Sequence, residues 1–191
     1  MHGLAASAIL LEKEHLREAV RIRLARRSDL QAILQLVNDE AEKTSGLAVR
    51  RVSCEEIESR VDSDLSYVAE LNNKIVGHLS ISLWKKLGYG ELRSFVVTEQ
   101  YWNIGIGSFL LSQVIDSAID NLCIDVIIAF RSTDITIGDG IFRSLGFVEV
   151  LFSKLPHQIQ REKEKSVNKR VYAKKLETIR WGRKSKHNNG R

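Results

Sequence analysis

The sequence has 191 residues, of which 43% are hydrophobic and 28% charged, a balance that excludes a disordered chain and is typical of one soluble domain. Its formal net charge is +5, and residues 178–191 alone carry five basic side chains and no acidic one. The rest of the chain is formally neutral, so nucleic acid is not an expected partner. No apolar segment is long enough to span a bilayer, so no membrane partner is expected and the cytoplasm is the expected location.

Composition divides the chain into three parts. Residues 1–19 are expected to form an N-terminal helical extension, residues 20–177 the main domain, and residues 178–191 a basic C-terminal tail. The tail is interpreted as a solvated terminus, and contact with an acidic or phosphate-bearing partner is the alternative. The two cysteines form no CxxC pair and have no ligand spacing with histidine, so no metal site is expected.

The domain opens with a strand and two capped helices. Residues 20–25 alternate apolar and charged side chains, which predicts a half-buried strand. Ser28 with Gln31 and Ser53 with Glu56 have the spacing of capping boxes, which predicts a helix after each serine. The first helix is expected to bury one apolar face, made of Leu30, Ile33, Leu34, Val37 and Ala41.

Short apolar runs separated by turn residues follow in the second half. Strands are expected at residues 67–71, 75–83, 90–97, 124–130, 147–152 and 171–176, and helices at residues 110–118 and 141–145. The run at 124–130 is nearly all apolar, which is typical of a strand buried on both faces. Pro156 is expected to mark the end of the sixth strand, and residues 160–170 form a charged stretch without a predicted element. This order predicts an α/β domain with a partly antiparallel sheet.

The segment from Glu91 to Leu111 is expected to carry the chemistry, as a strand, a glycine turn and a helix. Backbone amides at a helix N-terminus favour an anion, and Gly105 and Gly107 allow close approach and positive φ angles. The amides from Asn103 to Gly107 are the expected donors. A tight turn without a ligand would require similar residues, so this pattern by itself leaves both interpretations open.

The run Val97-Thr98-Glu99-Gln100-Tyr101-Trp102-Asn103-Ile104-Gly105-Ile106-Gly107 resembles the acetyl-CoA signature of the GNAT N-acetyltransferase superfamily. Residues 75–77 and 141–147 resemble two further elements of that superfamily. Residues 41–43, 91–97 and 155–156 are similar to the short N-acetylglutamate synthase type. The resemblance implies an α/β fold with a GNAT-like mixed, partly antiparallel central sheet flanked by helices. It also implies acetyl-CoA as co-substrate and a small-molecule amine acceptor, with L-glutamate the first candidate.

The resemblance also implies roles for individual residues. Glu91 is the candidate catalytic general base, and its alternative is a strand-edge carboxylate paired with Arg93 or a lysine. Arg93 and Ser94 are the candidate substrate-binding residues, for a substrate α-carboxylate. Backbone groups on the signature strand are expected to hold the pantetheine arm and to polarise the thioester. The residues expected to bind the cofactor are Phe95, Val96, Val97, Trp102, Asn103, Ile104, Gly105, Ile106, Gly107 and Ser108.

Several positions depart from the superfamily pattern. Trp102 stands where an arginine is usual, Asn103 where a glycine is usual and Glu99 where a proline is usual. The segment 131–140 is longer than usual and does not match the family's helix start, and Phe142 stands where a thiolate-protonating tyrosine is frequent. Two other functions therefore stay open: a non-catalytic acyl-CoA-binding or partner-binding module, and an acetyltransferase for a polyamine or protein amine. Exposed strand edges also leave a homodimer open.

Overall fold

The computed structural model describes residues 15–45, 49–63, 65–121, 124–134, 136, 138–164 and 169–176. Residues 15–19 are helical, but most of the predicted extension at 1–19 and all of the tail at 178–191 lie outside the described residues. These two boundaries stay predictions.

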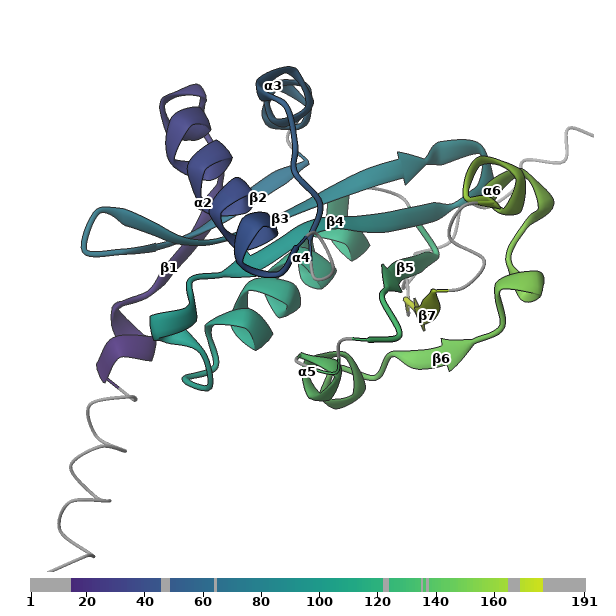
Figure 1. Cartoon of the computed structure of the whole chain (residues 1–191). Helices are drawn as coiled ribbons and strands as arrows, with labels where there is room; N and C mark the ends of the chain where they lie inside the picture. Colours follow the sequence, from purple (N-terminus) through teal and green to yellow (C-terminus); the bar gives the residue numbers. More distant parts are fainter. Residues whose placement is uncertain are drawn as a thin grey trace, which may run out of the picture.

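One mixed sheet of seven strands in the order β1-β2-β3-β4-β5-β7-β6 organises the fold (Figure 1). Strands β4 and β5 pair in parallel, and all other neighbours pair antiparallel, which confirms the predicted sheet. The strands are β1 Arg21–Leu24, β2 Ser66–Leu71, β3 Lys74–Trp84, β4 Tyr89–Val97, β5 Val126–Arg131, β6 Val148–Val150 and β7 Arg170–Lys175.

Helices cover both faces of this sheet, each over its own apolar core (Figure 1). On one face lie α2 Leu30–Lys43 and α3 Cys54–Asp62, whose core includes the fully buried Ile33 and Val37. On the other face lies α4 Ile106–Asn121, which buries Leu110 and Leu111 with residues of α5 Asp139–Ser144. The predicted helices are therefore present, with their apolar stripes turned to the sheet.

The first predicted capping box is wrong, and the second serine caps its helix as predicted. A short 3₁₀ turn, η1 Arg27–Asp29, contains Ser28 and precedes α2. The Asp29 carboxylate accepts from the Arg26 amide at 2.7 Å, and Asp29, not Ser28, is the residue directly before α2. Before α3, the Ser53 hydroxyl accepts from the Glu56 amide at 3.3 Å.

The region after the sixth strand also differs from the prediction. Strand β6 is shorter than residues 147–152, and Pro156 does not end it but caps the helix α6 His157–Glu162. Proline is tolerated there because the first turn of a helix leaves its N–H groups unpaired in any case. The charged stretch at 160–170 therefore begins inside a helix, which buries Ile159.

Strands β4 and β5 pair over a short stretch only. Their register runs from Tyr89 with Val126 to Glu91 with Ile128, and the two strands then part. Ser94 has a φ of 50°, next to an irregularity in the β3–β4 register between His78 and Ser80. This bulge re-aims the backbone of β4 before it reaches the glycine turn.

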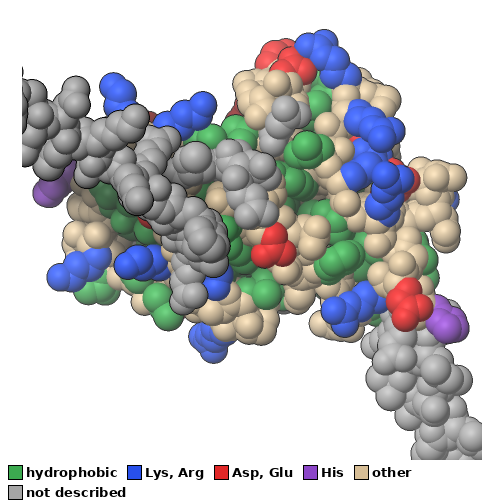
Figure 2. All heavy atoms as spheres, turned by 180° about the vertical axis from the view of Figure 1, so that it is seen from behind, with side chains coloured by type: hydrophobic (Ala, Val, Ile, Leu, Met, Phe, Trp, Pro, Cys, Tyr) green, Lys and Arg blue, Asp and Glu red, His purple; other side chains and the backbone are tan. Residues whose placement is uncertain are grey.

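The face of the molecule turned to the viewer in Figure 2 carries described side chains of several kinds. On the face seen in Figure 2, hydrophobic, basic and acidic side chains are interspersed. No helix within the described ranges is both long and apolar enough to cross a membrane.

Candidate active site

The predicted anion-binding turn lies between β4 and α4. Asn103 has a φ of 60° and Gly105 a φ of 91°, so both adopt the left-handed conformation. Asparagine is the non-glycine residue best suited to that region, which explains how Asn103 stands where glycine is usual. The first helical hydrogen bond runs from the Phe109 amide to the Gly105 carbonyl at 3.0 Å. The amides before Phe109 are therefore the N-terminal donors of a long helix, as an anion site requires.

Gly107 has a different role from Gly105. It lies inside α4 without a positive φ, and a Cβ atom there would stand 3.0 Å from Ile141 Cδ1 and 3.5 Å from Phe95 Cζ. The absence of a side chain at Gly107 thus brings α4 close to α5 and β4. The expectation that both glycines supply positive φ holds only for Gly105.

The carbonyl of Val97 faces the open edge of β4 and accepts a hydrogen bond from the indole of Trp102. The Thr98 amide donates to Val76 on β3 at 2.9 Å, so the amide and carbonyl of Val97 point to the opposite edge. The Trp102 Nε1 group donates to this carbonyl at 2.6 Å. Trp102 therefore turns back onto the strand instead of supplying a polar group to the turn.

Several residues predicted to bind the cofactor place their side chains in the core. Val96 packs with the core under α2, and Ile106 is 1% exposed in a third apolar cluster that also contacts Ile104. Phe95 meets Phe142 edge to face, with ring centroids 6.1 Å apart. Ser108 is partly buried at the start of α4. For Val96 and Ile106, only backbone groups are available to a ligand.

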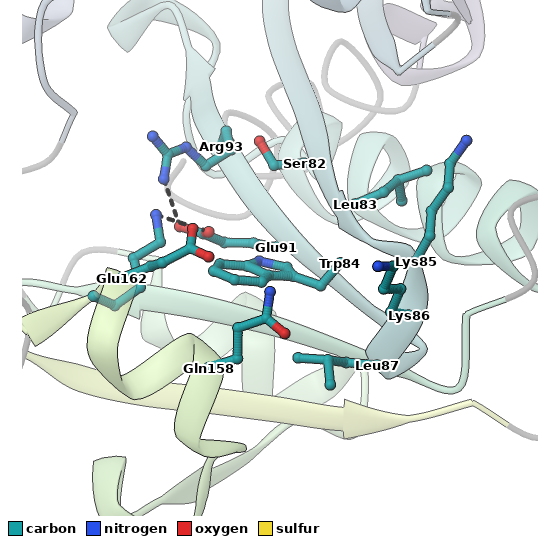
Figure 3. Close-up of a pocket in the computed structure, with 11 residues that line it drawn as sticks. Ser82, Leu83, Trp84, Lys85, Lys86, Leu87, Glu91, Arg93, Gln158 and Glu162 are labelled. Carbon is teal, nitrogen blue, oxygen red and sulfur yellow. Dashed lines mark hydrogen bonds and ion pairs between the residues drawn. The ribbon is translucent and has the colours of Figure 1, made fainter.

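A pocket of about 560 Å³ lies over the β3–β4 pair, beside α6 (Figure 3). Four of its side chains are cationic and two are anionic, so its walls carry an excess of positive charge. The lining residues are Ser82, Leu83, Trp84, Lys85, Lys86, Leu87, Glu91, Arg93, Gln158, Glu162 and Lys163.

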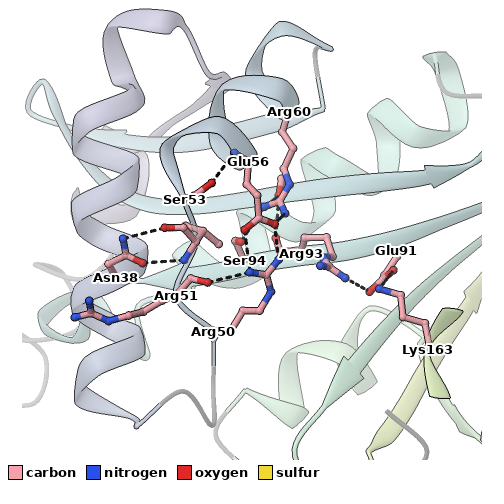
Figure 4. A network of polar contacts seen from close by, with 12 residues as sticks. Asn38, Arg50, Arg51, Ser53, Glu56, Arg60, Glu91, Arg93, Ser94 and Lys163 are labelled. Carbon is pink, nitrogen blue, oxygen red and sulfur yellow. Dashed lines mark hydrogen bonds and ion pairs between the residues drawn. The ribbon is translucent and has the colours of Figure 1, made fainter. Parts of the chain in front are cut away.

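Glu91 lies in this pocket between two cations. One carboxylate oxygen accepts from Arg93 Nη1 at 2.6 Å, and the other lies 2.9 Å from Lys163 Nζ (Figure 4). The residue is 3% exposed, so these pairs compensate the cost of its burial. The structure therefore shows Glu91 as a carboxylate paired with Arg93 and a lysine, which is the alternative to a general base. Glu91 also lines the pocket, where a ligand can reach it.

Arg93 lines this pocket and Ser94 does not. The Ser94 hydroxyl accepts from Arg60 Nη1 at 3.2 Å, toward α3 (Figure 4). Arg60 also donates to Ser80 at 3.3 Å and to Glu56 at 3.1 Å. Burial, and then the nearby charge of Arg93, lower the pKa of Arg60. Because successive residues of a strand point to opposite faces of the sheet, Ser94 has a different group of neighbours from Arg93.

Phe142 occupies a closed aromatic cluster. It is 2% exposed, stacks on Tyr172 with centroids 5.3 Å apart, and meets Phe147 edge to face. Tyr172 is 1% exposed and its hydroxyl accepts from Arg170 at 3.2 Å. Neither ring presents an accessible hydroxyl to a leaving thiolate.

Of the eleven residues that line the pocket, the sequence analysis named only Glu91 and Arg93 as site residues. Trp84, Lys85 and Lys86 lie where β3 ends and the 3₁₀ turn η2 Lys85–Leu87 begins. An aromatic residue followed by two lysines at the end of a predicted strand could have indicated a binding site. Lys163 comes from the end of the unpredicted α6, and no local pattern marks it.

Solved structures give the fold independent support. The N-acetylglutamate synthase of Neisseria gonorrhoeae, solved with coenzyme A and N-acetyl-glutamate, matches with a TM-score of 0.69 at 21% identity. The match covers 82% of this chain and 35% of that one, so the chain spans about a third of the synthase. A GNAT acetyltransferase of Staphylococcus aureus matches with a TM-score of 0.68 at 21% identity, over 83% of this chain and 99% of that one.

A ribosomal-protein-alanine N-acetyltransferase of Brucella melitensis matches with a TM-score of 0.63 at 25% identity, over 82% of this chain and 99% of that one. A search of curated proteins gives no match. Residues 30–147 match the acetyltransferase (GNAT) family, whose members are acyl-CoA N-acyltransferases with acetyl-CoA as co-substrate. With that match over more than half of its length, and with the predicted sheet in place, the chain belongs to the acetyltransferase (GNAT) family.

Proposed function

We propose that the protein transfers an acetyl group from acetyl-CoA to the amine of a small acceptor that carries a carboxylate, such as L-glutamate. The observation that carries this proposal is the pocket beside β4, in which Arg93 and Lys163 pair with the carboxylate of Glu91 and Lys85 and Lys86 add positive charge to the lining. A cationic wall favours an acceptor with negative charge, and a buried carboxylate favours an ammonium group. An amino acid has both groups. A cytoplasmic role in amino-acid biosynthesis belongs to the same proposal.

The chain can supply three parts of the transfer. The amides before Phe109 would hold the coenzyme pyrophosphate, and the open backbone edge from Ser94 to Val97 would hold the pantetheine arm and polarise the thioester carbonyl. Glu91 would accept a proton from the acceptor ammonium, which makes the amine nucleophilic. Because Phe142 has no proton to give, the leaving thiolate would take one from water.

The pocket charges weigh against a polyamine. A cationic acceptor would meet four positive side chains and would have to share two carboxylates with them. A protein amine would need an extended groove, whereas the side chains lining this pocket come from the β3–β4 region and α6.

The Trp102 contact favours a second candidate, a module without catalysis. An indole that holds the Val97 carbonyl at 2.6 Å competes with any ligand that needs the same carbonyl. Under the leading proposal this hydrogen bond must break on coenzyme binding, at a cost of about 1 kcal/mol.

Calorimetric titration with acetyl-CoA, followed by acetylation assays with L-glutamate and a panel of amines, tests the proposal. Trp102→Phe should tighten coenzyme binding about fivefold, and Gly105→Val should weaken it at least tenfold because a β-branched residue is strained at a φ of 91°. Turnover on carboxylate-bearing amines in preference to spermidine is expected. Saturable coenzyme binding without turnover on any amine would favour the module, and no binding at millimolar acetyl-CoA would reject both.

A further inference from the structure

We propose that Lys163 is itself an acetyl acceptor, so that the protein acetylates its own Lys163 when no free acceptor is present. This inference rests on the proposed function. Lys163 Nζ lies 2.9 Å from Glu91, in the place that an acceptor ammonium would need to occupy. It is a primary amine inside the pocket, on the carboxylate that the proposed reaction uses as base.

The surroundings of Lys163 hold its ammonium in the pocket. The residue follows α6, its amide donates to the Ile159 carbonyl at 2.9 Å, and its side chain is 20% exposed. The ammonium also lies 6.0 Å from the centre of the Phe130 ring. Lys85 and Lys86 line the same pocket, but within the described ranges neither forms an ion pair with Glu91. Position therefore distinguishes Lys163 from the other pocket lysines.

The chemistry is the proposed transfer with an internal amine. The ammonium of Lys163 gives a proton to Glu91, and the neutral amine attacks the carbonyl carbon of acetyl-CoA. A C–N bond forms and the C–S bond breaks. The attacking nitrogen then loses its second proton to water, and water gives one proton to the coenzyme thiolate. The products are Nε-acetyl-lysine and free coenzyme A, so no oxidant or further reactant is needed.

Acetylation would change the pocket in a defined way. It removes one of four cations and separates Lys163 from Glu91, which leaves the carboxylate paired with Arg93 alone. A pocket with less positive charge should hold a carboxylate-bearing acceptor less tightly. A free acceptor should in turn protect Lys163, because both need the same place beside Glu91.

The test is incubation of the purified full chain with acetyl-CoA alone, with peptide mass spectrometry at set times. The expected result is one acetyl group per chain at Lys163, at least tenfold faster than at the exposed Lys74 and at a rate per molecule independent of protein concentration. L-glutamate at high concentration should slow the modification at least fivefold. Lys163→Arg, which keeps the cation, should abolish it, and the matched control Lys74→Arg should not.

Glu91→Gln should slow labelling of Lys163 at least tenfold without changing that of Lys74, and circular dichroism checks that this variant folds. Equal labelling of Lys163 and Lys74 in the unmodified chain would overturn the inference without any variant. Turnover on free amines with unmodified Lys163 would reject self-acetylation but leave the proposed function standing. Absence of coenzyme binding would reject both.

Discussion

A single buried histidine shows how strongly position controls charge in this fold. His78 is fully buried on β3, where its Nε2 shares a hydrogen bond of 2.9 Å with the Ser66 hydroxyl. Burial first, and the charge of Arg60 second, lower the pKa of His78 to about 3. The imidazole is therefore neutral at physiological pH, beside the bulge that carries Ser94.

This pKa predicts the pH dependence of stability. The unfolded chain protonates His78 near pH 6.5, whereas the folded chain protonates it only near pH 3. Between these values the unfolded state binds more protons, so the free energy of unfolding should fall as pH falls, by up to ~1.4 kcal/mol per pH unit. Urea unfolding at several pH values measures this slope.

His78→Gln is the matched variant, because glutamine keeps a polar group but does not titrate. Arg23 and Arg50 lower the pKa values of Asp29 and Glu56, so protonation of these carboxylates in acid also lowers the free energy of unfolding. This loss is the same in both proteins. The difference between the two curves isolates His78. Equal slopes above pH 4.5 would show that His78 is not neutralised by folding.

The sequence predicted residues of the site that lie on β4, but not the residues from other elements that contact them. Glu91 and Arg93 could be predicted as pocket residues because alternate residues of a strand share one face. Ser94 was grouped with Arg93, but adjacent residues of a strand point to opposite faces, and the Ser94 hydroxyl meets Arg60 instead of the pocket. Lys163 lies 72 positions from Glu91 in the printed sequence, and only tertiary structure brings the two together.

At the scale of elements, the contact of α4 with α5 depends on one missing side chain. A Cβ atom at Gly107 would stand 3.0 Å from Ile141 Cδ1, at the base of the anion-binding turn. Gly107→Val should therefore lower the free energy of unfolding by about 1–3 kcal/mol through overpacking. Thermal denaturation or urea unfolding measures the loss.

The control for this prediction removes Ile141 Cδ1, the atom nearest to a Cβ at position 107. Ile141→Val lacks Cδ1, so in that background Gly107→Val should cost at least ~0.5 kcal/mol less than in the unmodified chain. Strictly additive effects would mean that the two side chains do not meet, and that Gly107 is required for some other reason.

The strands and the helices α2 to α5 were predicted from the sequence, and the helix α6 was not. The predicted strands and the helices α2 to α5 are all present, because each buries an apolar face that its sequence displays. Helix α6 has six residues and follows a proline, so it offers less than two turns of pattern. Its place depends on packing Ile159 against β5 and β7, which no local signal contains.

At the scale of the whole molecule, the opening between β4 and β5 divides the sheet into two parts joined by a register of three residue pairs. The proposed coenzyme site runs along this opening, from the pocket at Glu91 to the turn at Gly105. A ligand there would contact β4, α4 and the elements beyond β5 at the same time. It should therefore stabilise the folded chain as a whole and not only the turn.

Acetyl-CoA at 100 times its Kd should add ~2.7 kcal/mol to the free energy of unfolding, because it binds the folded chain alone. For a chain of 191 residues this corresponds to a rise in Tm of about 5–10 °C, measured by calorimetry. Hydrogen exchange should slow at the amides of Phe95, Val97 and residues 103–107, which face the opening or begin α4. Gly105→Val should lose both effects at the same ligand concentration. A rise in Tm without protection of these amides would place the coenzyme elsewhere on the molecule.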